Sequence, residues 1–224
     1  MSDSHLSHSA GPSVAWVEPV ETVSKPRGSQ NPEPRAARQI VVFASGSGSN
    51  FEAIVEQLQG KIEVALLVCD QPGAYCLERA ERLGVPTLVL SPKDFENKTA
   101  YETEIVQSLN KINPDLIVLA GYMRIIGPTL LAAYEGKIIN IHPALLPAFP
   151  GKDGIGDALK YGVKVLGITV HYVDEGIDTG KIIDQGALHI DPNDTEEQTR
   201  TKIHNLEHQL YPKVIMDLLN LDSQ

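Results

Sequence analysis

An asparagine and a histidine lie two residues apart in the segment Asn140-Ile141-His142, which closes a short run of β-branched residues. Alternate residues of a strand point to the same face, so the amide and the imidazole would face one ligand. An amide can donate to a developing oxyanion and an imidazole can transfer a proton, which are the groups that acyl-type transfer requires. A purely structural polar pair at a strand end is the alternative interpretation.

A glycine-rich turn, Ser45-Gly46-Ser47-Gly48-Ser49-Asn50, follows the first apolar run and precedes a helical pattern. Backbone N–H groups in such a turn, together with a helix N-terminus, favour an anion. The spacing begins like the dinucleotide fingerprint G-x-G-x-x-G, and Asp70 ends the second apolar run, where a ribose-binding acid would stand. Phe51, however, occupies the third glycine position. We therefore predict a monophosphate site rather than a dinucleotide site, with a plain tight turn as the alternative.

These residues need a sheet that brings strand ends together. Short β-branched runs alternate with helical patterns, which predicts an α/β fold with a mostly parallel, doubly wound, Rossmann-like sheet. A late antiparallel strand pair and a C-terminal helix follow; the helix begins near Thr195, where Gln198 completes a capping box, and we expect Pro212 to kink or end it. The expected strands are 39–44, 62–69, 85–90, 116–120, 137–141, 165–173 and 182–190, and the earlier helices are 51–58, 74–83 and 99–112.

Composition limits the class of protein. Residues 1–37 are rich in Ser, Pro and Glu and predict a disordered N-terminal tail, which leaves 38–224 as a single domain. The net charge of -10 disfavours nucleic acid and anionic membranes as partners. No apolar run is long enough to span a bilayer, so we expect a cytoplasmic protein. Cys69 and Cys76 match no metal or redox spacing, and we interpret them as reduced core thiols.

The segments Asn140–Pro147 and Gly167–Gly180 together resemble the signature of the formyltransferase family, and the resemblance extends over residues 39–220. It implies transfer of a formyl group from 10-formyltetrahydrofolate to the amine of glycinamide ribonucleotide (5'-phosphoribosylglycinamide) in purine (IMP) biosynthesis. It also implies two small-molecule substrates, no metal, and a monomer or homodimer.

The resemblance assigns roles residue by residue. A carboxylate near an imidazole favours its charged form, so Asp178 would keep His142 available as an acid and relay the amine proton through water. Lys98 stands where relatives often carry arginine. Lysine keeps the positive charge but lacks the planar guanidinium that can form two parallel hydrogen bonds with a carboxylate. The residues implied are Asn140, His142 and Asp178 for catalysis, Gly48, Ser49 and Asn50 for phosphate, Glu207 for the substrate amine, and Lys98, Met123, Arg124, Ile125, Ile126 and Asn140 for folate.

Several other functions share part of this pattern. Formyltetrahydrofolate hydrolase and methionyl-tRNA formyltransferase share the Asn-x-His and Asp residues, but the first usually carries a regulatory domain and the second an arginine-bearing loop where this chain has Ala148-Phe149. A non-catalytic nucleotide-binding module would need only the glycine turn. The segment His204–His208 fits the H-x-x-E-H pattern of zinc peptidases, yet only sixteen residues follow it to supply a third ligand.

Overall fold

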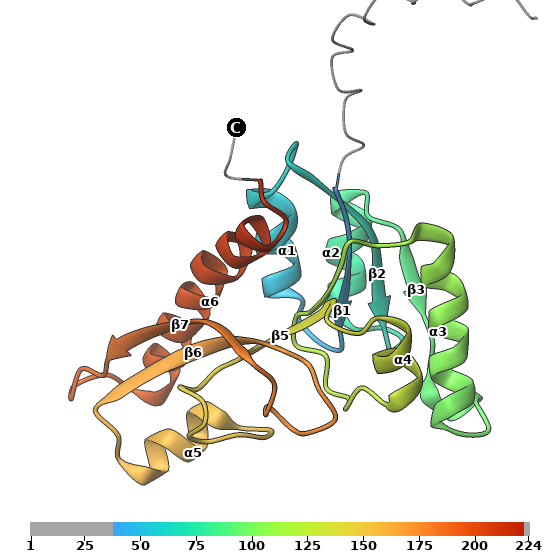
Figure 1. Cartoon of the computed structure of the whole chain (residues 1–224). Coiled ribbons are helices and arrows are strands. Elements are labelled where there is room, and N and C mark those ends of the chain that lie inside the picture. Colours follow the sequence, from blue (N-terminus) through green and yellow to red (C-terminus); the bar gives the residue numbers. More distant parts are fainter. Residues whose placement is uncertain (1–37, 222–224) are drawn as a thin grey trace, which may run out of the picture. The chain divides into compact units, whose positions relative to one another are not determined.

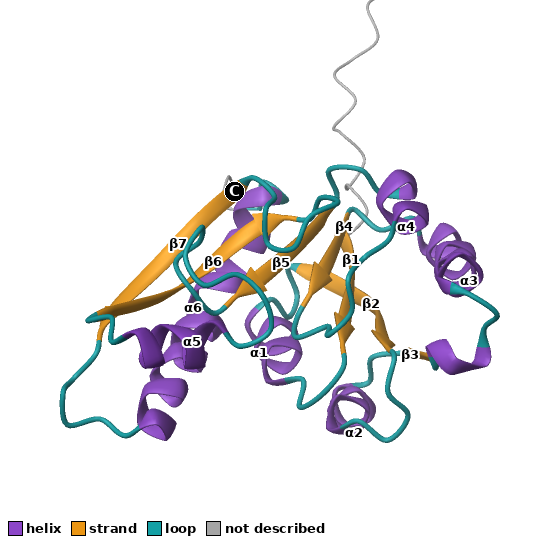
Figure 2. Ribbon diagram, turned by 90° about the horizontal axis from the view of Figure 1, so that it is seen from below, coloured by secondary structure: helices purple, strands orange, loops and turns teal. Residues whose placement is uncertain are grey.

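The computed structural model describes residues 38–221, which form one sheet of seven strands with helices on both faces (Figures 1 and 2). The predicted tail, residues 1–37, lies outside the described residues, and the domain boundaries stay a prediction. The strands are β1 (Arg38–Ala44), β2 (Ile62–Cys69), β3 (Thr87–Val89), β4 (Leu116–Leu119), β5 (Ile138–His142), β6 (Val165–Tyr172) and β7 (Ile182–His189). The α-helices are α1 (Ser49–Gln57), α2 (Tyr75–Leu83), α3 (Lys98–Ile112), α4 (Pro128–Ala133), α5 (Gly154–Tyr161) and α6 (Glu196–Leu218).

The strand order is β3-β2-β1-β4-β5-β6-β7. Strands β1 to β5 run parallel, β6 pairs antiparallel with β5, and β7 pairs antiparallel with β6. The predicted fold class is therefore confirmed. The carboxyl ends of β1, β4 and β5 lie side by side at one edge of the sheet, where ligands bind in open α/β sheets.

The alternation of side chains along β1 sends its residues into two separate cores. Ile40 and Val42 pack with residues of α1, α2, α5 and α6, whereas Val41 and Phe43 pack with residues of α3 and α4. All four side chains are fully buried, as expected for a parallel strand with helices on both faces. Figure 2 shows the two helical layers on opposite sides of the strands.

Helix α6 begins at the predicted capping box: the Thr195 side chain accepts from the Gln198 backbone N–H, and the Gln198 side chain accepts from the Thr195 N–H. The helix does not end at Pro212 but continues to Leu218. Proline lacks the N–H that would bond the carbonyl four residues earlier. That carbonyl, on His208, instead accepts a hydrogen bond of 2.8 Å from the Gln57 side chain of α1. A long-range partner thus replaces the missing helical bond.

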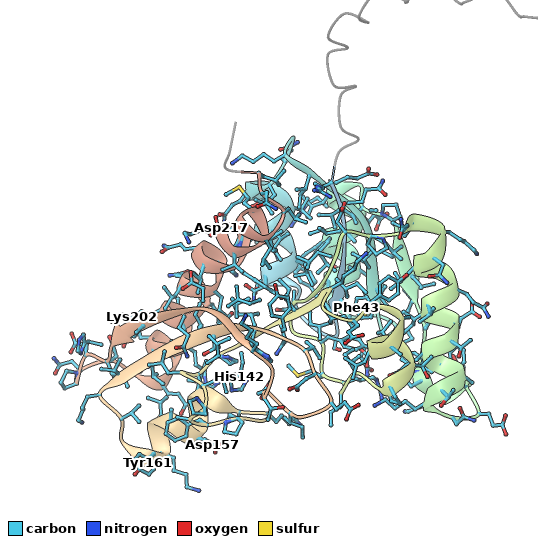
Figure 3. All side chains as sticks on the ribbon, in the orientation of Figure 1. Phe43, His142, Asp157, Tyr161, Lys202 and Asp217 are labelled. Carbon is cyan, nitrogen blue, oxygen red and sulfur yellow. The ribbon has the colours of Figure 1, made fainter. Side chains whose placement is uncertain are left out.

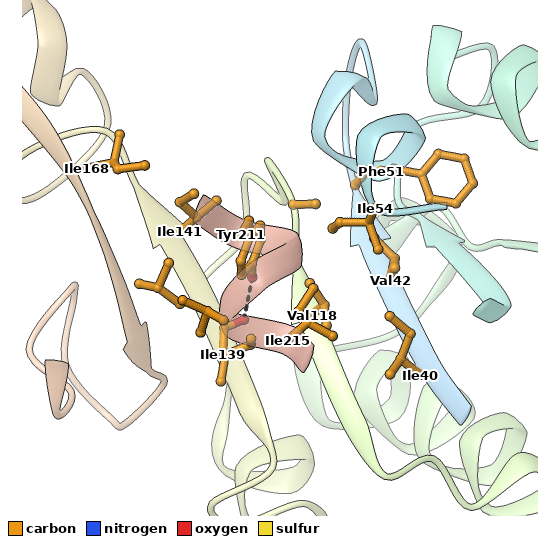
Figure 4. Packing of buried hydrophobic residues seen from close by; sticks show 14 of the residues in the cluster. Ile40, Val42, Phe51, Ile54, Val118, Ile139, Ile141, Ile168, Tyr211 and Ile215 are labelled. Carbon is orange, nitrogen blue, oxygen red and sulfur yellow. Dashed lines mark hydrogen bonds between the residues drawn. The ribbon is translucent and has the colours of Figure 1, made fainter. Parts of the chain in front are cut away.

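Tyr211 fixes α6 against the middle of the sheet (Figure 4). Its hydroxyl donates to the carbonyl of Leu119 at 3.0 Å and lies 3.3 Å from that of Ile139. The side chain is completely buried among residues such as Ile141 and Ile215. The hydroxyl therefore links α6 to the backbone of both β4 and β5.

Two helices and one strand differ from the sequence predictions. Helices α4 and α5 were not expected, because one has only six residues and the other opens with Gly154 and Gly156. The α5 N-terminus is stabilised by Asp153, whose side chain accepts from the Gly156 N–H at 3.0 Å. Strand β3 spans three residues rather than 85–90. Within the described part of the chain, every helix is too short or too polar to cross a bilayer.

Candidate active site

Strand β5 presents Asn140 and His142 on the face opposite to Ile139 and Ile141, which pack into the core beside α6. The prediction that the amide and the imidazole share one face is therefore confirmed. Because β6 runs antiparallel to β5, it places His171 directly across from Asn140. Figure 3 shows His142 beside β5 and β6.

His142 has a defined orientation. Its Nε2 lies 2.8 Å from the carbonyl oxygen of Phe149, and a carbonyl can only accept, so this nitrogen carries a hydrogen. Its Nδ1 lies 3.4 Å from Oδ2 of Asp178. The ring is almost fully buried, at 4% exposure. The structure thus brings the predicted imidazole and carboxylate together and leaves Nδ1 as the nitrogen that can exchange a proton.

His171 belongs to the same network, although the sequence analysis gave it no role. Its Nδ1 donates to the Tyr172 carbonyl at 2.8 Å, so its Nε2 can accept from the Asn140 amide nitrogen at 3.2 Å. The same Nε2 lies 3.6 Å from Oδ1 of Asp178. The Asn140 amide nitrogen has two hydrogens, and one remains for a ligand. The antiparallel register of β5 and β6 identifies His171, because it places this residue opposite Asn140.

Asp178 comes from the loop between β6 and β7 and adopts a left-handed backbone conformation with φ of 56°. Aspartate tolerates this region better than most residues. Oδ2 also accepts from the Gly151 N–H at 2.8 Å. Burial raises the pKa of Asp178, but the neighbouring imidazoles of His171 and His142 and the hydrogen bond from the Gly151 N–H outweigh it, so this pKa lies below its ordinary value.

The glycine turn leads into α1 through Gly48, whose backbone conformation only glycine adopts freely. Gly48 has φ of 72°, and a Cβ there would lie 2.5 Å from the Cβ of Cys76. No side chain caps the α1 N-terminus, so its N–H groups are left for an anion. Phe51, the residue that argued against a dinucleotide site, is fully buried in the core.

Glu207 of α6 reaches the same turn. Its Oε2 accepts hydrogen bonds from the side chains of Asn50 at 3.0 Å and His204 at 2.9 Å. The carboxylate is 4% exposed, whereas His204 is about half exposed. In the sequence, His204 stands out only as part of a pattern typical of zinc peptidases. The structure instead shows it paired with a residue that lines the cavity.

The segment that follows β4 forms another wall of the site. The Met123 N–H donates to Oγ of Ser45 at 2.9 Å, which links this segment to the glycine turn. Met123 and Ile125 expose large apolar side chains, while Ile126 is buried. The Arg124 Nε donates to Asp70 at 2.6 Å, so this acid holds the arginine rather than standing free.

One cavity of about 500 Å³ connects these groups. Its lining includes eleven of the twelve predicted site residues, namely Gly48, Ser49, Asn50, Met123, Arg124, Ile125, Ile126, Asn140, His142, Asp178 and Glu207. The exception, Lys98, is the first residue of α3 and lines a second cavity of about 540 Å³. The two cavities share the residues Tyr122 to Ile126. Lys98 therefore lies beyond the far side of the Met123–Ile126 wall.

The described residues contain no group of three or more His, Cys, Asp or Glu side chains that could hold a metal ion. Cys69 and Cys76 are both free and buried, with 3.6 Å between their sulfur atoms. Cys76 donates a hydrogen bond to Cys69, which lowers the pKa of the Cys69 thiol to about 7 although burial opposes this shift. The interpretation of both as reduced core thiols agrees with this geometry.

The glycine turn, with no side chain capping the helix that follows it, and the side chains of Asn140, His142 and Asp178 line one cavity at the carboxyl edge of an α/β sheet, where ligands bind in this class of fold. Comparison with known proteins identifies the protein family. The model of the Formyl transferase family matches residues 38–215. The chain belongs to the formyl transferase family.

Several relatives share most of the described chain. Phosphoribosylglycinamide formyltransferase of Bacillus subtilis (strain 168) is 56% identical over 190 residues, covering 84% of this chain and 97% of the relative. The crystal structure of glycinamide ribonucleotide transformylase 1 from Geobacillus kaustophilus is 56% identical, with a TM-score of 0.79, covering 82% of this chain and 99% of that one. The trifunctional purine biosynthetic protein adenosine-3 of Drosophila melanogaster is 39% identical, over 82% of this chain and 14% of its own length.

Proposed function

We propose that this protein transfers the formyl group of 10-formyltetrahydrofolate to the amine of glycinamide ribonucleotide, a step of purine (IMP) biosynthesis. The observation that carries the proposal is the meeting of Asn140, His142 and Asp178 in a cavity that also contains the Gly48 turn. The name and the 56% identity of the Bacillus subtilis relative support the same activity. We propose both substrates as small molecules and 10-formyltetrahydrofolate as a co-substrate rather than a resident cofactor.

The phosphate of glycinamide ribonucleotide would bind at the N-terminus of α1. Gly48, Ser49 and Asn50 supply backbone N–H groups there, and the helix dipole adds partial positive charge. Glu207 would contact the substrate amine or its ribose end, since it lines the same cavity and is held by Asn50. This arrangement would direct the amine toward the end of β5.

Attack of the neutral amine on the formyl carbon builds negative charge on the formyl oxygen. Asn140 has one amide hydrogen bonded to His171 and a second available for this oxygen. Because the network holds the amide in place, the donor need not reorganise during the reaction. Loss of one such donor costs roughly 100- to 1,000-fold in rate in enzymes where it was measured.

His142 would move protons in the second half of the reaction. Its Nε2 is occupied by the Phe149 carbonyl, so Nδ1 is the acidic position, and Asp178 at 3.4 Å stabilises the imidazolium. The attacking amine loses one proton and N10 of the folate gains one as the carbon–nitrogen bond breaks. Asp178 would accept the amine proton through water, which leaves tetrahydrofolate and the formylated amide as products.

The folate would lie against the segment Met123–Ile126. Met123 and Ile125 offer apolar surface, Arg124 offers a guanidinium held by Asp70, and the cavity volume suits a ring system. Lys98 lines the adjoining cavity, where it would meet the acidic tail of the folate as a point charge. We propose a cytoplasmic location, with no nucleic acid or membrane partner, and a monomer or homodimer.

The test mixes the protein with both substrates and follows release of tetrahydrofolate, with a parallel reaction that lacks glycinamide ribonucleotide. We expect release that depends on the amine. Release without the amine would identify a formyltetrahydrofolate hydrolase instead. Binding of the ribonucleotide without any release would identify a non-catalytic nucleotide-binding module.

A further inference from the structure

The loop between β5 and α5, residues 143–153, contacts two members of the proposed catalytic network through its backbone. The Phe149 carbonyl accepts from Nε2 of His142 at 2.8 Å, and the Gly151 N–H donates to Asp178 at 2.8 Å. Because both contacts use main-chain atoms, they do not depend on the side chains of the loop. The orientation of the imidazole and of the carboxylate therefore depends on where the loop backbone lies.

Two side chains of neighbouring strands hold the start of this loop. Thr169 lies opposite His142 in the pairing of β5 with β6, and Gln185 lies opposite Thr169 in the pairing of β6 with β7. The Thr169 hydroxyl donates to the Ala144 carbonyl at 2.7 Å and accepts from the Leu146 N–H at 3.0 Å. The Gln185 amide nitrogen has two hydrogens, and it donates to the Leu146 carbonyl at 3.0 Å and to the Thr169 hydroxyl at 2.9 Å.

These bonds are the main attachment of the loop to the sheet. Among the described residues, no other side chain forms a hydrogen bond with the stretch 144–148, and Thr169 is completely buried. The Ala148 N–H donates to the Leu145 carbonyl at 3.0 Å, which closes a turn just before Phe149. A displacement at the start of the loop would therefore also move the carbonyl that binds the catalytic imidazole.

We infer that Gln185 and Thr169 are positioning residues for the transfer reaction, which hold the β5–α5 loop so that the Phe149 carbonyl fixes the ring of His142. Neither of the two lines the cavity that contains His142, so they act through the loop and not through the substrates. The inference rests on the proposed function for the identity of the reaction. The hydrogen bond of His142, however, can be measured in the protein without substrates.

The first test is NMR spectroscopy of the His142 imidazole in ¹⁵N-labelled protein. A hydrogen that is bonded inside the structure exchanges slowly with water, so the Nε2–H should give a cross-peak, assigned by its loss in His142→Asn. We expect this cross-peak in the wild type and in Thr169→Ser, which keeps the hydroxyl. It should broaden or disappear in Gln185→Leu and in Thr169→Val, which remove the donors but keep side chains of similar size.

The second test is steady-state kinetics of the same variants. A misplacement of about 1 Å can cost about 100-fold in rate, so we expect kcat of Gln185→Leu and Thr169→Val to fall about 10- to 100-fold, with both KM values within about threefold of the wild type. Gln107→Leu is the matched control, because it makes the same change at an exposed position of α3. It should match the wild type, as should Thr169→Ser. A merely structural role would lower the melting temperature but leave kcat and the cross-peak unchanged.

The exposed residue Gln185 keeps the inference testable if Thr169→Val does not fold. Absence of the Nε2–H cross-peak from the wild type, its persistence in Gln185→Leu, or a wild-type kcat in Gln185→Leu would each overturn the inference. If the wild type transfers no formyl group, the proposed function fails, and the cross-peak alone still decides whether Gln185 and Thr169 hold His142 in place.

Discussion

Replacing Asp178 with asparagine removes one charge from the proposed catalytic network and changes little else. Asparagine has nearly the same shape and tolerates the left-handed backbone that residue 178 adopts. Its side-chain oxygen can still accept from the Gly151 N–H, which Asp178 bonds at 2.8 Å. The loss of charge should therefore weaken the imidazolium of His142 without dismantling the loop.

The size of the effect follows from the distance between His142 and Asp178. Two unit charges 3.4 Å apart interact by about 5 kcal/mol at an effective dielectric constant of about 20, and by about 1 kcal/mol in bulk water. The two side chains are 5% and 12% exposed, so the interaction belongs nearer the larger value. Each 1.36 kcal/mol is a factor of about ten. We expect kcat to fall about 100- to 1,000-fold.

The assay is steady-state release of tetrahydrofolate, with kcat and both KM values determined for the wild type and Asp178→Asn. Asp157→Asn is the control, because it makes the same chemical change at an exposed position on α5 (Figure 3). We expect the control to match the wild type, and Asp178→Asn to lose kcat with KM values within a few-fold. A kcat for Asp178→Asn within threefold of the wild type would refute the reasoning.

Three further substitutions test other parts of the structure. Gly48→Ala should lower stability and raise the KM for the ribonucleotide, because the backbone has φ of 72° and the added Cβ would meet Cys76; an unchanged KM and melting temperature would contradict this. Tyr211→Phe should lower the free energy of unfolding by about 0.5–1.5 kcal/mol in urea, since it removes a buried hydrogen bond between α6 and the backbone of β4 and β5, and an unchanged free energy would count against that reasoning. Burial would raise the pKa of Asp115, but the Gln39 N–H and the Arg38 guanidinium outweigh burial and lower this pKa. The carboxylate therefore stabilises the fold at pH values above its unfolded pKa. This contribution is lost as the pH falls through the lower pKa of the folded state. Asp115→Asn should accordingly lower the melting temperature at pH 7, and its deficit should shrink as the pH falls into the acid range; a deficit that does not change with pH would show that charge is not the cause.

Much of the fold could be predicted from local patterns. The β-branched runs that became β1, β4 and the second half of β2 are mostly buried on both faces, so their signal is continuous and does not depend on distant residues. Helix α4 had no such signal. Its N-terminus is stabilised by Glu102 from α3, which accepts from the Gly127 N–H at 2.5 Å. Pro212 likewise remains inside α6 because Gln57 bonds the carbonyl that proline leaves free.

Some residues of the candidate site could likewise be predicted from local patterns, whereas others depend on contacts between distant segments. Asn140 and His142 could be placed together because a period of two is a local property of a strand. The place of His171 depends on the antiparallel register of β5 and β6, and the pairing of His204 with Glu207 depends on α6 approaching the α1 turn. Both relations are tertiary. No spacing in the sequence shows which of these histidines faces the cavity.

The most direct test of the account follows an isotopically labelled formyl carbon from 10-formyltetrahydrofolate by NMR in the presence of glycinamide ribonucleotide. We expect the label to appear as an amide on the ribonucleotide, and His142→Asn to slow this transfer at least 100-fold while the ribonucleotide still binds. Label that appears as free formate, or transfer by His142→Asn at the wild-type rate, would contradict it.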